Sequence, residues 1–105
     1  MKTVIIRKSP KPQKKWRATF VEPGRHKSVD FGLKGYSDYT KHKNRHRMFS
    51  YVRRHSGMHE NWAWSGRYSA GFWSRWLLWS RPSLLSALGV VKHKLPGYRV
   101  ILRQS

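Results

Sequence analysis

Apolar and polar residues alternate in the first third of the chain, a pattern typical of β-strands. On both sides of a Pro-Gly turn, apolar side chains occupy every second position: Trp16, Ala18, Phe20, Val29 and Phe31. Two alternating runs around such a turn predict a β-hairpin over residues 15–31. The β-branched residues within 3–7 predict another strand, which belongs to a basic and partly extended N-terminal arm over residues 1–14.

The chain after the hairpin changes to a helical pattern. Ser37 is a suitable N-cap, and Asp38 in the first turn would complement the helix dipole. We therefore expect a single helix from about Asp38 to His55. Its second half is amphipathic, with one arc of the helical wheel formed by Met48, Phe49, Tyr51, Val52 and His55.

The second half of the chain continues as helices and closes with a strand. A short helical turn is expected within residues 59–64, a longer helix over 69–79 and another over 82–95. The C-terminal strand would pair with the N-terminal strand or with the hairpin. The predicted fold is a single small α+β domain over residues 1–105, with an arm, a hairpin, a region of three to four short helices and a closing strand at 1–14, 15–31, 32–95 and 98–105.

Charge separates this chain from an ordinary small domain. It has 23 Lys and Arg against four acids, which gives a formal net charge of +19 on 105 residues. So few carboxylates cannot supply paired-carboxylate hydrolysis, a two-metal site or a calcium loop, and the lack of cysteine removes thiolate chemistry and disulfides. Because the aromatic share is 14%, the chain is expected to fold. We expect a non-enzymatic protein that works beside a polyanion or an acidic protein surface.

The densest basic run lies in the predicted first helix. The candidate contacts with an anionic partner are Lys41, Lys43, Arg45, Arg47, Arg53 and Arg54. Each phosphate contact would add about one unit to the salt dependence of binding. Since no RRM-type aromatic motif, KH-type clamp or zinc-knuckle spacing accompanies the run, any nucleic-acid binding is expected to be weakly sequence-specific.

The histidines and serines do not form a recognisable catalytic or metal motif. His42 and His46 are four residues apart, as are His55 and His59, but neither pair comes with the third and fourth ligands that a structural zinc site needs. No Gly-x-Ser-x-Gly elbow is present. The sequence therefore predicts no catalytic residue, metal, cofactor or small-molecule substrate.

Aromatic residues concentrate in the second half of the chain. The candidates for core or protein-interface packing are Trp62, Phe72, Trp73, Trp76 and Trp79. The helical spacing of the last three Trp residues favours packing over stacking on nucleobases. The mixture of Trp, Leu and Arg over residues 69–91 leaves an interfacial segment on an anionic membrane as an alternative.

Two stretches are more distinctive than composition requires: residues 31–40 (FGLKGYSDYT) and 70–79 (AGFWSRWLLW). With residues 53–55 and 60–62 between them, they resemble a family of small basic proteins encoded by nucleocytoplasmic large DNA viruses of the chlorella-virus and iridovirus kind. The resemblance covers residues 29–84.

The resemblance implies a virion protein made in the host cell cytoplasm. It points to a minor capsid protein on the inner side of a large icosahedral shell, with the major and other minor capsid proteins as partners and the viral inner membrane or DNA as further ones. The aromatic helix would dock between capsid subunits while the basic surface neutralises acidic faces. The alternative is a nonspecific nucleic-acid-binding or genome-condensing protein. The chain departs from the family pattern at Ala63-Trp64 and Arg67-Tyr68, which indicates an extra packing contact there.

Overall fold

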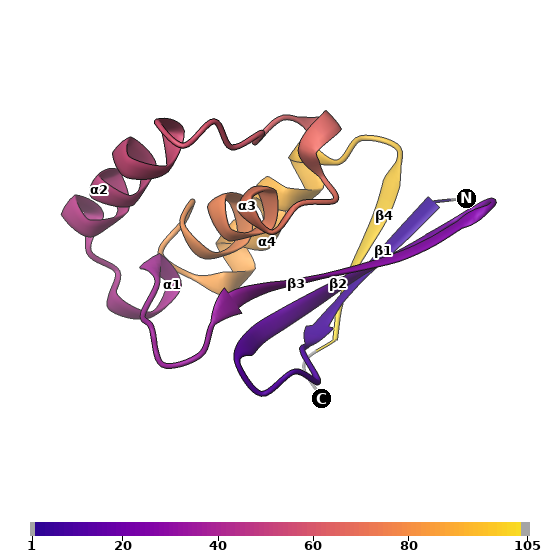
Figure 1. Ribbon diagram of the computed structural model, residues 1–105, viewed down its shortest axis with the longest axis horizontal. Coiled ribbons are helices and arrows are strands. Elements are labelled where there is room, and N and C mark those ends of the chain that lie inside the picture. Colours follow the sequence, from indigo (N-terminus) through magenta and orange to yellow (C-terminus); the bar gives the residue numbers. More distant parts are fainter. Residues whose placement is uncertain (1, 104–105) are drawn as a thin grey trace.

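The computed structural model describes residues 2–103, in which a four-stranded sheet carries the helices on one face (Figure 1). The strands are β1 (Lys2–Lys8), β2 (Lys14–Glu22), β3 (Arg25–Leu33) and β4 (Tyr98–Leu102). Their order across the sheet is β3-β2-β1-β4, with β4 parallel to β1 and the other pairs antiparallel. The α+β prediction is confirmed, and the C-terminal strand pairs with β1. The parts of the predicted arm and closing strand at residues 1 and 104–105 lie outside the described residues.

The predicted hairpin is present as β2 and β3. Glu22 pairs with Arg25 across the turn, and Gly24 has a φ of 74°, a conformation that favours glycine. Farther along the pair, Ala18 lies opposite Val29, and both side chains are buried. The period-two pattern of the sequence therefore identifies the face that meets the helices.

The segment expected as an N-terminal arm contributes an inner strand of the sheet. Val4 and Ile6 of β1 are fully buried, and β1 has a neighbouring strand on each side. These alternating β-branched side chains fit a sheet face covered by helices. The strand predicted within residues 3–7 is confirmed as β1, which is held by pairing along both of its edges.

The helical layer consists of short elements. These are α1 (Tyr39–His42), α2 (Arg45–Ser56), the 3₁₀ turn η1 (Trp64–Gly66), α3 (Ala70–Trp73), the π-helical turn η2 (Ser74–Leu78) and α4 (Leu84–Lys94). Of the residues 59–64 that were predicted to form a helical turn, only Trp64 is helical, as the first residue of η1. The predicted helix at 69–79 changes to wider winding after Trp73, because the Trp79 N–H donates to the Ser74 carbonyl oxygen (3.0 Å).

The single helix expected over residues 38–55 is wrong, because the chain breaks it into α1 and α2. Lys43 adopts a left-handed conformation with a φ of 57° and ends α1. Asn44 then caps α2, where its side-chain oxygen accepts a hydrogen bond from the Arg47 N–H (3.2 Å). At the start of α1, Asp38 is the N-cap in place of the expected Ser37.

The core forms where η2, α3 and α4 meet the sheet. Trp73 is fully buried, with its ring stacked on Phe31 at a centroid distance of 5.6 Å and edge-on to Phe20 at 5.9 Å. Its Nε1 donates a hydrogen bond to the Arg67 carbonyl oxygen (2.8 Å). By contrast, α2 lies at the side of the helical layer far from the sheet (Figure 1).

Gly66→Ala is expected to lower the free energy of unfolding by about 3 kcal/mol. A Cβ at Gly66 would lie 2.1 Å from the Asn61 carbonyl oxygen, so the backbone around η1 must shift. Gly89→Ala in α4 is the matched control, since its Cβ would meet nothing within 4 Å and Ala favours helix. Urea denaturation measures both variants, and equal stability would contradict the close approach at Gly66.

Candidate functional site

All four acids of the chain lie within the described residues, and each is bound by side chains of the same chain. The most buried is Asp38, which is 2% exposed. Its carboxylate accepts hydrogen bonds from the Lys15 Nζ (2.6 Å) and from the backbone N–H (3.0 Å) and hydroxyl of Thr40. This carboxylate therefore caps α1 and fixes α1 to β2.

The Asp30 carboxylate on β3 accepts hydrogen bonds from side chains of neighbouring chain segments. Arg17 binds both of its oxygens, at 2.9 and 3.1 Å, and the Ser9 hydroxyl donates to one of them (2.7 Å). The hydrogen bonds from Arg17, against the opposing effect of burial, lower the pKa of Asp30 to about 2. This carboxylate stays ionised at every physiological pH.

Acidification is expected to destabilise the protein through Asp30. Because the folded-state pKa of this carboxyl is about 2 and its ordinary value is 3.8, its contribution is present above pH 4 and is lost as the pH falls toward 2. Urea denaturation between pH 5 and pH 2 measures this loss against Asp30→Asn, which keeps the shape but cannot ionise. An identical pH dependence in both proteins would show that Asp30 makes no such contribution.

The other two acids are held by aromatic and imidazole donors. Glu22 accepts a hydrogen bond from the Tyr68 hydroxyl, and although burial opposes ionisation, such bonds hold the pKa of Glu22 below its usual value. Glu60 accepts from the Trp62 Nε1 (2.9 Å) and lies 3.2 Å from the His55 Nδ1. With every acid engaged internally, the surface of the protein carries the positive excess.

The structure places the six predicted anion-contact residues on the exposed surface of α1, α2 and the junction between them, namely Lys41, Lys43, Arg45, Arg47, Arg53 and Arg54. We call this group the helical basic patch. Tyr51 of α2 stacks on Trp79 at a centroid distance of 4.3 Å and an interplanar angle of 2°, which fixes α2 to the rest of the helical layer. The Lys43 Nζ is bound to the Pro82 carbonyl oxygen. Contacts with the rest of the protein therefore fix the position of the patch. Its residues come from two separate helices, α1 and α2, and from the junction between them.

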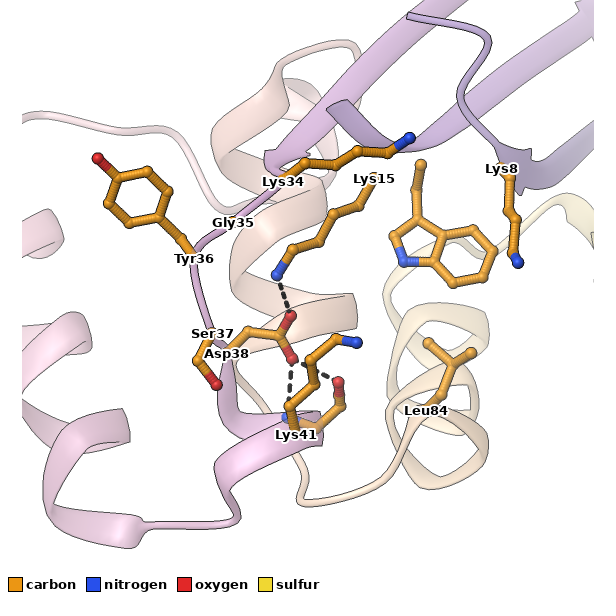
Figure 2. Close-up of a pocket in the computed structure, with 11 residues that line it drawn as sticks. Lys8, Lys15, Lys34, Gly35, Tyr36, Ser37, Asp38, Lys41 and Leu84 are labelled. Carbon is orange, nitrogen blue, oxygen red and sulfur yellow. Dashed lines mark hydrogen bonds and ion pairs between the residues drawn. The ribbon is translucent and has the colours of Figure 1, made fainter. Parts of the chain in front are cut away.

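A pocket of about 720 Å³ lies beside the helical basic patch (Figure 2). We call it the lysine pocket, and its basic and aromatic lining residues are Lys8, Lys15, Trp16, Lys34, Tyr36 and Lys41. Figure 2 shows Lys15 directed at Asp38, with Lys8 and Leu84 on the other side of the pocket. Across residues 2–103, no carboxylate lies within 4.0 Å of the amines of Lys8, Lys34 or Lys41.

The chemistry of the lysine pocket suits an anion that carries a flat apolar group. Trp16 is partly buried, whereas Tyr36 is 70% exposed and free to contact a ligand ring. Lysine amines would meet the negative charge of such a ligand. Sequence reasoning did not group these residues, because Lys8, Trp16 and Lys34 come from three segments that only strand pairing brings together.

The predicted aromatic residues divide between the core and its margin. Phe72 and Trp73 are fully buried, while Trp62, Trp76 and Trp79 are partly buried. Of the two roles that the sequence left open, core packing therefore describes Phe72 and Trp73. Their burial removes them from any docking surface.

The extra packing contact expected near residues 63–68 is present. The Arg67 guanidinium lies 3.4 Å from the centroid of the Trp64 ring and 4.6 Å from that of Tyr68. Its Nε donates to the Tyr98 hydroxyl (2.9 Å), which ties η1 to β4. These contacts stabilise the fold through cation–π stacking.

The two histidine pairs are split by the local structure. His42 ends α1 and His46 lies in α2, beyond the break at Lys43. Burial lowers the pKa of His42, and its Nδ1 accepts a hydrogen bond from the Asn44 N–H (2.9 Å). No group of three potential metal ligands comes together in the part of the chain that the structure describes. Nor is any described helix long and apolar enough to cross a membrane.

Comparison with protein-family models finds a similarity to a family of unknown function (DUF5754). Its family model matches residues 4–55, which are 52 of the 105 residues of the chain. The matched segment contains most of β1, the hairpin, α1 and most of α2, and so includes the helical basic patch and most of the lysine pocket. No curated protein sequence and no solved structure matches the chain.

Proposed function

We propose that the protein is a non-enzymatic minor capsid protein of a large icosahedral DNA virus, located on the inner side of the shell. The main support for this proposal is that all four carboxylates are bound by side chains of the same chain. The net charge of +19 therefore lies at the surface with no exposed acid to offset it. The resemblance of residues 31–40 and 70–79 to small basic proteins of large DNA viruses supports capsid proteins as the partners.

The proposed contact is electrostatic. The helical basic patch lies against acidic faces of the major and other minor capsid proteins, with the viral inner membrane or DNA as further anionic neighbours. Because its surface has no unpaired acid, one copy of the protein repels another. A negatively charged neighbour would reduce this repulsion and stabilise the folded protein. Because Phe72 and Trp73 are core residues, docking of the aromatic helix between capsid subunits, as a further part of the proposal, would be made by the partly buried Trp62, Trp76 and Trp79.

Neutralising the helical basic patch is expected to reduce incorporation into DNA-free shells by at least about tenfold. The variant replaces its six residues with Gln, so the formal charge falls from +19 to 19 − 6 = +13. The control exchanges Lys and Arg at the same six positions, which keeps the charge. Quantitative mass spectrometry of purified shells measures incorporation. Absence of the unmodified protein from such shells would overturn the proposal.

The second candidate function is nonspecific nucleic-acid binding, which the lysine pocket favours. Lysine amines and the rings of Trp16 and Tyr36 line the same pocket, a combination that suits a phosphate backbone and its bases. If this candidate holds, duplex DNA retains the protein at about 0.15 M salt, and the paired change Lys8→Gln and Lys34→Gln lowers the salt slope by about two units. An unchanged slope would exclude the pocket as a phosphate contact.

A further inference from the structure

A second pocket, which shares no residue with the lysine pocket, lies between η2 and α4. Its volume is about 540 Å³, and its polar lining consists of Arg75, Ser80, Arg81, Ser86, His93 and Lys94. We call it the arginine pocket. Four of these side chains are basic, and no acid lines the pocket. Unlike the helical basic patch, it therefore gathers positive charge around a concave surface of ligand size.

Arg75 is held in a fixed orientation but has no anionic partner among residues 2–103. Its guanidinium lies 4.5 Å from the Trp76 ring centroid and 5.4 Å from that of Trp62, and its Nη1 donates to the Trp79 carbonyl oxygen (2.8 Å). Its buried Nε has no hydrogen-bond partner in the described structure. Burial lowers the pKa of Arg75, and the nearby charge of Arg81 lowers it further.

In the part of the chain that the structure describes, the other basic groups of the pocket also form no ion pair with a carboxylate. The Lys94 Nζ lies 4.2 Å from the Trp76 ring centroid, so the same indole supports two cations. Arg81 reaches only the Ser80 carbonyl oxygen, at 3.5 Å. Because all four acids of the chain are engaged elsewhere, none is available to relieve the repulsion between these charges.

We propose that the arginine pocket binds a small polyphosphate anion. Guanidinium groups bind phosphate through paired hydrogen bonds, and a guanidinium already fixed by stacking loses little freedom on binding. A single phosphate brings a charge of about −1.5 to −2, so two or three linked phosphates match the basic lining. Free triphosphate, a nucleoside triphosphate and an inositol phosphate share this chemistry. The proposal does not depend on the capsid role.

Arg75 also has a structural role, because its bond to the Trp79 carbonyl oxygen caps η2. The test therefore changes Arg81 and Lys94, the two other Lys or Arg residues that line the pocket. The matched control is Arg7→Gln with Arg99→Gln, which removes the same charge from exposed positions. Both lie on strands whose alternating neighbours, Ile6 and Val100, pack against the core, so they face the side of the sheet away from the helices.

Isothermal titration calorimetry at constant ionic strength measures binding of tripolyphosphate to the full chain. We expect one saturable site, weakened at least about tenfold by Arg81→Gln with Lys94→Gln and less than about twofold by the control. Equal weakening in both variants would show nonspecific attraction and overturn the proposal. Parallel titrations with ATP and inositol hexakisphosphate show which of the three polyphosphates binds most tightly and so which kind of ligand the pocket prefers. If none of the three binds, the proposal is overturned. Unchanged thermal unfolding midpoints verify that the variants fold.

Discussion

Trp73→Ala is expected to lower the free energy of unfolding by about 3–5 kcal/mol, a large part of the stability of a small domain. The substitution removes a fully buried indole that contacts Phe20 and Phe31 on the sheet. It also leaves the Arg67 carbonyl oxygen without its donor. Urea denaturation followed by circular dichroism measures the loss.

Trp64→Ala is the control for Trp73, because the Trp64 side chain is 40% exposed and lies at the margin of the fold. Its main contact is the stacking with Arg67, so the expected loss is about 1 kcal/mol. A Trp73→Ala protein as stable as Trp64→Ala would contradict the placement of Trp73 at the centre of the core.

Asp38→Ala is expected to cost about 3–5 kcal/mol, because it breaks a buried ion pair and removes a helix cap in one step. Asp38 is 2% exposed and the Lys15 side chain is 12% exposed, so the lysine amine would lose its charged partner in a poorly solvated position. Urea denaturation again gives the loss. The lysine pocket should also change shape, since Lys15 and Asp38 form part of its wall.

Two further variants separate the charge of Asp38 from its capping bond. Asp38→Asn keeps an oxygen for the Thr40 N–H but removes the negative charge, so we expect an intermediate loss. Combining Asp38→Asn with Lys15→Met should restore part of the stability, because no uncompensated charge remains. If the double variant is less stable than Asp38→Asn alone, the Lys15–Asp38 pair is not the reason for the loss.

The strands could be predicted because their pattern is local and repeats every second residue. The break at Lys43 and Asn44 could not, because it depends on two polar contacts: the Asn44 side chain accepts from the Arg47 N–H, and the Asn44 N–H donates to the His42 ring. Such bonds compete with helix continuation without changing the hydrophobic pattern. Asn44 is a recognised cap residue, so its position before Arg45 was the available signal.

The candidate site was predictable only where its residues are neighbours in sequence. The helical basic patch comes from residues 41–54 and is exposed, because burying so many charged side chains without partners would be unfavourable. The lysine pocket joins segments that are far apart in the sequence. The residues of the arginine pocket all lie within 75–94, but the pocket forms only where η2 packs against α4. Periodicity alone likewise could not decide whether Phe72 and Trp73 face the core or a partner, because both roles need the same apolar face.

On the proposed function, an acidic shell surface rather than DNA is the main counterpart of the basic surface. The most direct measurement is the partition of purified protein between DNA-free shells and duplex DNA, mixed together at about 0.15 M salt and separated by sedimentation. If the proposed function is right, the protein sediments with the shells, and neutralising the helical basic patch releases it. Protein bound to the DNA, with the shells left bare, would overturn the proposed function.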